Sequence, residues 1–226
     1  MQVFIINKNR LTTTRQLVQQ LEGKADLTII DNESSWEPLL EWYSSECPVK
    51  VVLGEDFGPR TLWTGHDDLT PEGEVYAVTD SDLDLTDCIN LDKPLLPFLS
   101  EALDKYPDVM KVGVSLRLDD LPDEYPEKEF TLKRESEYWE DERDEDFYNA
   151  DVATTLAVYR PGNPVQYGPA LRSKPPYQAR HVPWYLTPET MTDEERYYLD
   201  HADFEKWRGI VFSRRIIDRL DVLEGS

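Results

Sequence analysis

The chain has 226 residues, of which 39% are hydrophobic and 11% aromatic, which is enough for one compact domain with a sizeable core. Its formal net charge of −22, from 46 acidic and 24 basic residues, argues against nucleic-acid or membrane-surface binding, because such a surface repels phosphates and anionic lipid head groups. No run approaches the roughly 18 apolar residues of a membrane span and the N-terminus lacks the layout of a signal peptide, so we expect a cytoplasmic protein.

Short apolar runs alternate with segments of helical period along the first half of the chain. The pattern predicts strands at 2–9, 25–34, 49–54, 74–80, 109–118 and 152–160. It predicts helices at 10–23, 35–45 and 94–107. Strands that alternate with helices are joined by right-handed crossovers and form a parallel sheet with helices on its faces. We therefore expect an α/β sandwich with a mostly parallel central sheet.

The second half is less regular. Residues 137–151 are strongly acidic and are expected to form an exposed helix face. Residues 161–186 are rich in proline and aromatic residues and predict an ordered loop. The remaining tail predicts two helices, the first beginning at Thr192 with Glu195 three residues on as a capping box.

Polar residues follow the expected strands where each strand ends. They are Asn7, Asp31, Asp80 and Asp119. Ligands of open parallel sheets bind at the carboxyl ends of the strands, so one edge of the sheet would collect these side chains. The pair Asp80 and Asp82 suits Mg²⁺ or Mn²⁺, which take oxygen ligands and are usually held by one or two carboxylates together with substrate phosphates.

Other interpretations of these residues stay open or are excluded. An EF-hand fails because Leu85 and Leu91 stand where that loop needs glycine and glutamate. The chain also lacks a P-loop, a G-x-G-x-x-G turn and a G-x-S-x-G elbow. Asp31 with Asn32 can instead cap the following helix, the aspartates after residue 79 can form a solvated turn, and His181 can be structural.

Several segments, taken in order, resemble small GT-A-fold glycosyltransferases, including a type that decorates viral capsids. They are "FIINKNR", "IIDNES", "TDSDLD", "VGVSLRLDDLPDEYP", "WEDE", "DVATTLAVYR" and "ARHVPWYL", with "DSD" as the D-x-D motif. The resemblance spans most of residues 1–215. It implies a single GT-A-like catalytic domain over 1–226, with a nucleotide-binding half at 1–90 and the acceptor side with the C-terminal loop and helices at 91–226.

The resemblance also implies roles for individual residues. The nucleotide would be bound by Asn7, Arg10, Asp31, Asn32, Asp80 and Ser81. The cation, Mn²⁺ or Mg²⁺, would be ligated by Asp82 and by His181. Asp119 or Asp120 would be the general base, with Asp151 or Glu140 as alternatives; two adjacent carboxylates are expected to raise each other's pKa, which favours a base.

The sequence thus predicts a metal-dependent glycosyltransferase that moves a sugar from a nucleotide diphosphate, with UDP the expected nucleotide, onto a glycan or other hydroxyl acceptor with inversion. One alternative is a sugar-phosphate nucleotidyltransferase, although "NKNRLTTT" lacks the glycine-rich loop that such enzymes use to hold a triphosphate. The other alternative is a non-catalytic acidic module that binds a carbohydrate or a protein.

Overall fold

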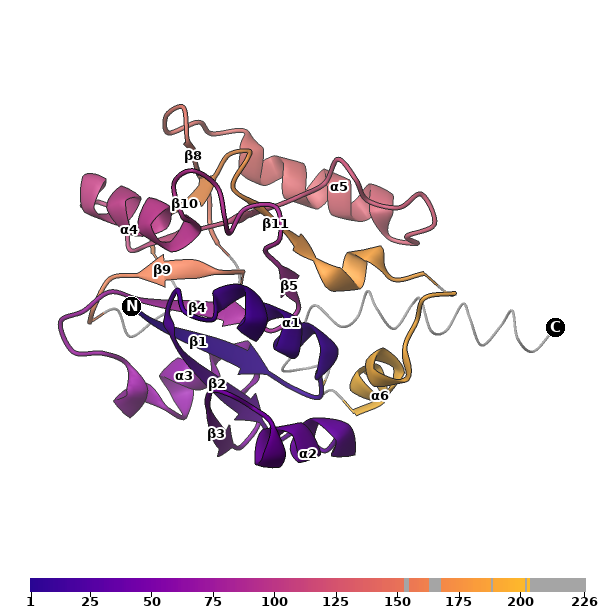
Figure 1. Cartoon of the computed structure of the whole chain (residues 1–226). Coiled ribbons are helices and arrows are strands. Elements are labelled where there is room, and N and C mark those ends of the chain that lie inside the picture. The colour runs from indigo at the N-terminus through magenta and orange to yellow at the C-terminus, as the bar shows by residue number, and fades with distance from the viewer. Residues whose placement is uncertain (153–154, 163–167, 188, 202, 204–226) are drawn as a thin grey trace.

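A large sheet with helices on both sides forms the centre of the molecule (Figure 1). The computed structural model describes residues 1–152, 155–162, 168–187, 189–201 and 203. The described strands of this sheet lie in the order β3 (Lys50–Gly54), β2 (Asp26–Asn32), β1 (Gln2–Asn7), β4 (Tyr76–Asp80), β9 (Ala157–Tyr159), β6 (Lys111–Gly113), β10 (Ala170–Ser173) and β8 (Phe147–Asn149).

The sheet is mostly parallel, as the sequence predicts. β1 pairs in parallel with β2 and β4, β2 with β3, and β6 with β10. β9 is antiparallel to both β4 and β6, and β8 is antiparallel to β10. The expected α/β class, with a mostly parallel central sheet flanked by helices, is therefore confirmed, and the strand expected at 152–160 is the antiparallel member in its middle.

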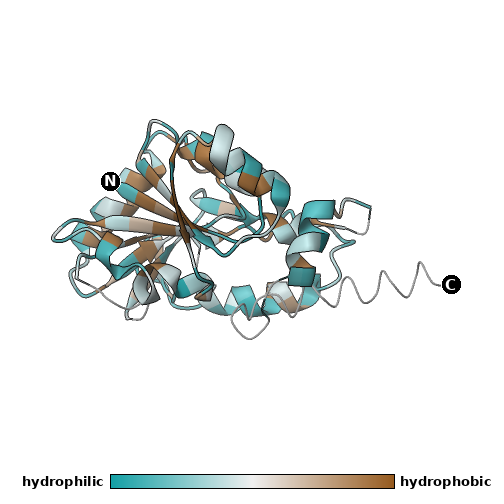
Figure 2. Ribbon diagram, turned by 90° about the horizontal axis from the view of Figure 1, so that it is seen from below, coloured by the Kyte–Doolittle hydropathy of each residue, from teal (hydrophilic) through white to brown (hydrophobic). Residues whose placement is uncertain are grey.

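Helices cover the two faces unequally. The described α-helices are α1 (Thr12–Leu21), α2 (Glu37–Ser45), α3 (Thr61–Thr64), α4 (Leu95–Lys105), α5 (Lys128–Ser136) and α6 (Asp193–His201). Helices α1, α2 and α4 place their buried leucines in one core cluster with one face of the sheet, whereas α3 contributes Leu62 to the cluster on the other face. Figure 2 shows the apolar strands between these layers.

The two core clusters explain why the strand sequences are apolar without interruption. Successive side chains of a strand point to opposite faces. Val3 and Ile5 of β1 belong to one cluster, and Phe4 and Ile6 belong to the other. A strand that is covered on both faces needs apolar residues at every position, which is the pattern typical of parallel sheets with helices on both sides.

A second, three-stranded sheet was not predicted. It consists of β5 (Leu83–Asp84), β11 (Gln178–His181) and β7 (Ser115–Leu116), with β11 in the middle. The strand expected at 109–118 is thus divided between β6 in the large sheet and β7 in the small one. The segment 161–186, expected to be a loop, contains β10 and β11, because these short strands depend on distant partners rather than on a local pattern.

The expectations for residues 137–151 and for the C-terminal tail have different outcomes. Residues 137–151 do not form a helix: a short 3₁₀ turn (Glu137–Trp139) is followed by bends and by β8, so the expectation there was wrong. Helix α6 begins as predicted, with Thr192 Oγ1 accepting a hydrogen bond from Glu195 N at 3.2 Å. The second expected helix of the tail lies outside the described residues. Within the part of the chain that the structure describes, no helix is long and apolar enough to cross a membrane.

Candidate functional site

The carboxyl edge of the large sheet gathers most of the polar residues that the sequence analysis placed there. Asn7 lies opposite Asp31, and Ile6 lies opposite Asp80, in the registers of β1 with β2 and with β4. By strand alternation Asn7 and Asp31 share one face, while Asp80 is on the face of Val78. Asp119 is not at this edge, because it follows the small strand β7 and pairs with Arg117 at 2.7 Å.

A buried hydrogen-bond chain connects the ends of β4, β1 and β2. Ser81 Oγ donates to Asn7 Oδ1 at 2.8 Å, and Asn7 Nδ2 donates to Tyr43 Oη at 2.7 Å. Tyr43 Oη then donates to Asp31 Oδ2 at 3.0 Å. These hydrogen bonds all point in one direction, from the Ser81 hydroxyl to the Asp31 carboxylate. Each side chain donates to the next, so the network fixes the side chains relative to one another.

Asp31 accepts three hydrogen bonds from the protein itself. Besides Tyr43, its carboxylate accepts Ser34 N at 2.8 Å and Ser34 Oγ at 2.6 Å, which shapes the loop between β2 and α2. Burial raises the pKa of Asp31, although the hydrogen bonds from Ser34 and Tyr43 act in the opposite direction. The side chain of the next residue, Asn32, accepts Phe57 N at 3.2 Å, so both residues organise loops at the sheet edge.

The turn after β4 meets β11, which comes from the C-terminal part of the chain. His181 lies opposite Leu83 in the pairing of β11 with β5, and Val182 N donates to Asp82 O at 2.9 Å. These backbone contacts bring His181 Nε2 to 3.4 Å from Asp82 Oδ2. The structure thus places side by side the two residues that the resemblance assigns to a cation.

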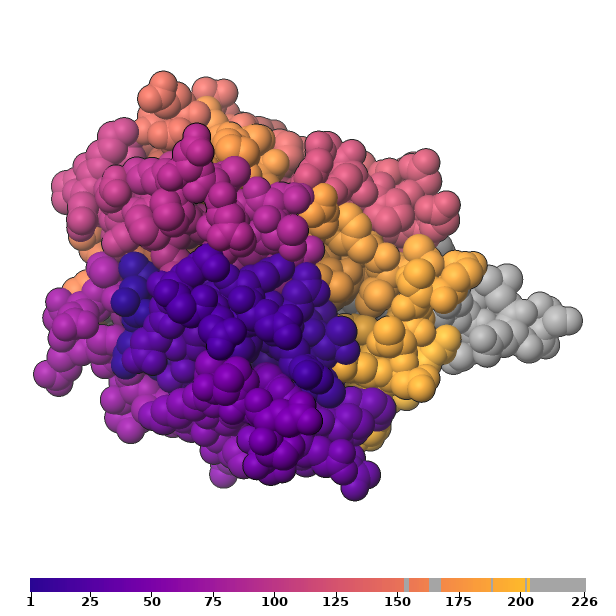
Figure 3. All heavy atoms as spheres, viewed as in Figure 1, coloured from indigo at the N-terminus to yellow at the C-terminus, as the bar shows by residue number. Residues whose placement is uncertain are grey.

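Arg10 already pairs with this aspartate. Its Nη1 donates to Asp82 Oδ2 at 2.6 Å, while Nε and Nη2 donate to the two carboxylate oxygens of Glu195 on α6 at 2.8 and 3.1 Å. The guanidinium also lies over the ring of Tyr198, 3.7 Å from its centroid. Helix α6 is therefore attached to the loop between β1 and α1, and Figure 3 shows the C-terminal part of the described chain against the N-terminal elements.

Electrostatics keep Asp82 and Arg10 charged despite their burial. Burial disfavours the ionised form of Asp82, but the interactions with His181 and Arg10 outweigh it and hold its pKa well below the usual range. Burial likewise opposes the charge of Arg10, and the Glu195 carboxylate, with smaller contributions from Tyr198 and Asp82, raises its pKa well above the ordinary value. Asp82 is therefore an anion at neutral pH.

The donor set fits a divalent cation that shares its coordination with a ligand. Asp82 Oδ1 and His181 Nδ1 are buried and have no hydrogen-bond partner among the described residues. No group of three histidine, cysteine or acidic side chains suited to a metal occurs in the described ranges, and Asp82 and His181 are the two candidate ligands here. Mg²⁺ is commonly bound by one or two protein groups together with substrate phosphates.

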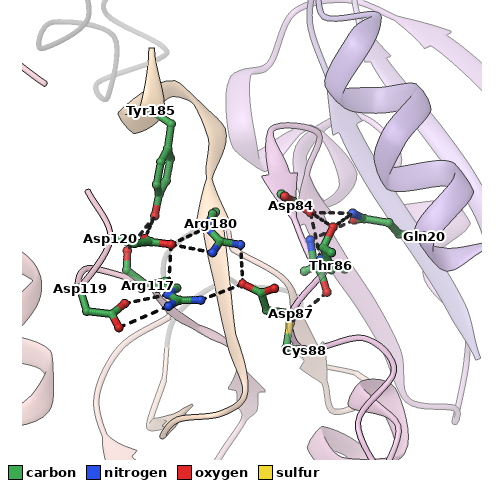
Figure 4. A network of polar contacts seen from close by, with 11 residues as sticks. Gln20, Asp84, Thr86, Asp87, Cys88, Arg117, Asp119, Asp120, Arg180 and Tyr185 are labelled. Carbon is green, nitrogen blue, oxygen red and sulfur yellow. Dashed lines mark hydrogen bonds and ion pairs between the residues drawn. The ribbon is translucent and has the colours of Figure 1, made fainter. Parts of the chain in front are cut away.

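Asp119 and Asp120 belong to a different cluster, which Figure 4 shows. Asp120 accepts Arg180 Nε at 2.7 Å and Tyr185 Oη at 2.6 Å, and Arg117 pairs with both aspartates. Because Arg180 and His181 are neighbours in β11, their side chains point to opposite faces, which separates this cluster from Asp82.

The expectation that the two aspartates raise each other's pKa is wrong. The hydrogen bond from Arg117 lowers the pKa of Asp119. Burial acts to raise the pKa of Asp120, but the hydrogen bonds from Tyr185 and Arg180 bring it below its usual value. Both side chains are stable anions rather than carboxylates poised to accept a proton near neutral pH.

Asp151 lies in a third position. Its side chain is 63% exposed and pairs at 2.7 Å with the buried Lys111 of β6. Burial raises the pKa of Tyr159, and the carboxylates of Asp80 and Asp151 both add to that effect. Lys111 lies opposite Tyr159, which lies opposite Tyr76, so the Lys111 side chain that Asp151 contacts is on the face of the sheet that carries Asp80.

A hollow of about 570 Å³ lies at the opposite edge of the sheet. It is lined by residues that include Gln2 and Asp26, the first residues of β1 and β2, together with Asp68, Glu72 and Glu74. The hollow therefore lies at the other end of the strands from the candidate site, and its lining is acidic.

Two residues of the site were not singled out in the sequence. Tyr43 belongs to the apolar side of α2, and Glu195 was interpreted only as part of a helix cap. Nothing in the local pattern predicts their contacts with Asp31 and Arg10, because both contacts join residues that are distant along the chain.

No family model matches the chain, and no curated protein matches it. Among solved structures, it is similar to UDP-glucose pyrophosphorylase in complex with UDP-glucose, with a TM-score of 0.40 and 13% identity over 76% of this chain and 74% of that one. It is also similar to apo-UDP-glucose pyrophosphorylase, with a TM-score of 0.43 and 12% identity over 89% of this chain and 100% of that one.

Proposed function

We propose that the protein is a metal-dependent enzyme that transfers a sugar from a nucleotide diphosphate, UDP in our assignment, to a hydroxyl acceptor with inversion. The observation that supports it most is the pairing of Asp82 with His181 at the carboxyl edge of the sheet, 3.4 Å apart. Asp82 is an anion with one buried oxygen that lacks a partner among the described residues. The cytoplasm is the expected compartment.

Under this proposal Asp82 and His181 hold Mn²⁺ or Mg²⁺. The bound cation would neutralise negative charge on the leaving diphosphate. The nucleotide would be positioned by residues at the ends of β1, β2 and β4, namely Asn7, Arg10, Asp31, Asn32, Asp80 and Ser81. The hydrogen bonds that link Ser81, Asn7, Tyr43 and Asp31 fix the geometry of these side chains before the nucleotide sugar binds.

The acceptor hydroxyl needs a carboxylate to take its proton, and general-base help is worth about 10² to 10⁴ in rate. The candidates are Asp119, Asp120 and Asp151. The lowered pKa of Asp119 and of Asp120 makes them weaker bases. We favour Asp151, whose exposed carboxylate pairs with a single basic group, Lys111, on the face of the sheet that carries Asp80.

A second candidate function is that of a sugar-phosphate nucleotidyltransferase, the enzymatic alternative that the sequence analysis leaves open. Such an enzyme would have to hold a triphosphate at the loop after β1. That loop is Lys8-Asn9-Arg10, without glycine, and its two basic side chains are already paired, Lys8 with Asp56 and Arg10 with Asp82 and Glu195. The lack of glycine in this loop favours sugar transfer over nucleotidyl transfer.

Product analysis separates the functions. The wild type is incubated with UDP-sugars and Mn²⁺, with and without a panel of hydroxyl acceptors, and UDP is measured; a parallel reaction with UTP and sugar 1-phosphates is assayed for pyrophosphate. Sugar transfer predicts UDP release that EDTA abolishes. Pyrophosphate release alone would establish the nucleotidyltransferase, and carbohydrate binding that is insensitive to EDTA without turnover would establish a binding module.

Asp82→Asn provides the site-specific arm of this assay, and Asp84→Asn is its matched control. Asp84 lies two residues further on in the same acidic run and accepts hydrogen bonds from Gln20 and Thr86 instead of facing His181. UDP release should be lost in Asp82→Asn and kept in Asp84→Asn.

A further inference from the structure

Arg10 is held between two carboxylates at the centre of the candidate site. The side chains of Arg10, Asp82 and Glu195 are all 7–8% exposed. The guanidinium uses two different edges: Nη1 faces Asp82, while Nε and Nη2 form a bidentate pair with Glu195. One buried guanidinium is thus shared by two buried carboxylates.

The guanidinium and His181 face the same oxygen. Arg10 Nη1 lies 2.6 Å and His181 Nε2 lies 3.4 Å from Asp82 Oδ2. A cation held between His181 Nε2 and Asp82 Oδ2, the two atoms that face each other, would therefore approach the oxygen that the guanidinium occupies. Two positive groups on one buried carboxylate would repel each other strongly, because the interior screens charges less than water does.

We propose that Arg10 is an internal competitor of the cation for Asp82, and that Glu195 is the positioning residue that retains the guanidinium when the cation displaces it. This inference rests on the proposed function. The bidentate pair with Glu195 does not involve the Nη1–Asp82 contact, so Arg10 can release Asp82 and still keep a carboxylate partner. A buried guanidinium without any carboxylate would be costly, which makes Glu195 necessary for the exchange.

Glu195 is suited to this role because α6 is fixed independently of Arg10. The neighbouring Glu194 accepts Thr12 N at 3.0 Å and Thr12 Oγ1 at 3.1 Å at the start of α1. Tyr197, one helical turn after Glu194, donates to Ser35 Oγ at 3.0 Å. The Glu195 carboxylate therefore stays in place while the contact between Arg10 and Asp82 opens.

The test is to measure Mn²⁺ binding in the absence of nucleotide. The electron paramagnetic resonance signal of free Mn²⁺ reports how much of the ion remains unbound. Arg10→Met removes the competitor and should bind Mn²⁺ roughly tenfold or more tightly than the wild type, because the buried pair no longer has to open. Glu195→Gln should bind Mn²⁺ roughly tenfold or more weakly, because the displaced guanidinium has no carboxylate left. In the double variant the Glu195→Gln effect should disappear.

The controls make the result specific. Arg15→Met removes an arginine from the exposed face of α1, where it pairs with Glu46 at 3.7 Å, and should leave Mn²⁺ affinity unchanged. Adding Asp82→Asn to Arg10→Met should abolish the tighter binding. Equal or weaker Mn²⁺ binding by Arg10→Met, or a Glu195→Gln effect that persists in the double variant, would overturn the inference, as would a complete absence of Mn²⁺ binding in all variants.

A structure of the wild type with Mn²⁺ and UDP gives a result that does not depend on the folding of any variant. The inference predicts that Arg10 has left Asp82 Oδ2 and still pairs with Glu195. Mn²⁺ on Asp82 with Arg10 Nη1 still bonded to Oδ2 would contradict the exchange while leaving the proposed function intact. UDP bound without Mn²⁺ at Asp82 would contradict both.

Discussion

His181 Nε2 lies 3.4 Å from Asp82 Oδ2, although one residue belongs to the turn after β4 and the other to the end of β11. The contact depends on the small sheet, in which His181 is paired with Leu83. The C-terminal part of the chain therefore completes the polar edge that the N-terminal strands begin. If a cation binds there, each of the two residues should be needed for it.

The first prediction concerns His181. His181→Gln should weaken Mn²⁺ binding by at least roughly tenfold, because even the loss of a hydrogen-bond partner of a metal ligand typically costs about that much. UDP binding without metal should change little. His201→Gln is the matched control, since His201 is exposed and stacks on Tyr197, 3.8 Å between ring centroids. Calorimetry of both variants measures the effect; equal losses in the two would contradict a role of His181 at the cation.

The second prediction concerns Tyr43, which joins Asn7 to Asp31. Tyr43→Phe removes the hydroxyl that accepts from Asn7 and donates to Asp31, so two buried polar groups lose a partner. We expect a loss of about 1–3 kcal/mol in the free energy of unfolding, together with weaker UDP binding. Chemical denaturation and calorimetry measure the two effects.

Tyr76→Phe is the control for Tyr43. Its hydroxyl is also buried, but it accepts from Trp63 in the core cluster on the other face of the sheet. This variant should lose stability without losing UDP affinity. If the two variants reduce UDP affinity equally, the hydrogen-bond chain does not position the nucleotide site.

How far the sequence predicts the fold is clear from individual strands. β1, β2 and β4 were predictable, because both faces of each are covered and the apolar run is continuous. β10 and β11 were missed because Arg172 and Arg180 interrupt them and because their partners are distant along the chain. Arg172 is buried and pairs with Glu135 of α5 at 2.8 Å, and no local pattern reveals that pair.

The third prediction is a pH dependence. Burial acts to raise the pKa of Asp144, but hydrogen bonds from Tyr106, Lys105 and Asp146 N lower it to about 2. The folded-state value is below that of the unfolded chain, so the stabilisation is fully present above about pH 5 and is lost as the pH falls towards 2.

Asp144→Asn should therefore cost about 1–2 kcal/mol at pH 7, and the difference from the wild type should shrink between pH 5 and pH 2. Urea unfolding at several pH values measures it. Asp123→Asn is the control, because Asp123 is 95% exposed and its pair with Lys128 should contribute little at any pH. A constant difference for Asp144→Asn across this range would refute the assignment.

The fourth prediction tests the packing of β6 in the middle of the sheet. A Cβ on Gly113 would lie 2.5 Å from Val152 Cγ1 and 2.9 Å from the carbonyl oxygen of Leu156. Gly113→Ala should therefore destabilise the protein by about 1–3 kcal/mol through overpacking. Thermal unfolding measures this, and an unchanged Tm would show that the strand has room to move.

The candidate site was only partly predictable, for a related reason. The positions of Asn7, Asp31 and Asp80 follow from strand ends, which a sequence pattern reveals. The resemblance suggested His181, which the structure places beside Asp82. The partners of these residues could not be predicted: Arg10 reaches Glu195 on α6, and Asp120 is held by Arg180, so tertiary contacts determine which carboxylates are paired.

Calorimetric titration of UDP into the wild type, with Mn²⁺ and with EDTA, tests the central proposal most directly. The account predicts tight binding with Mn²⁺, much weaker binding with EDTA, and no effect of Mn²⁺ on UDP binding by Asp82→Asn. UDP binding of equal strength with Mn²⁺ and with EDTA, or an Asp82→Asn variant that responds to Mn²⁺ as the wild type does, would contradict it.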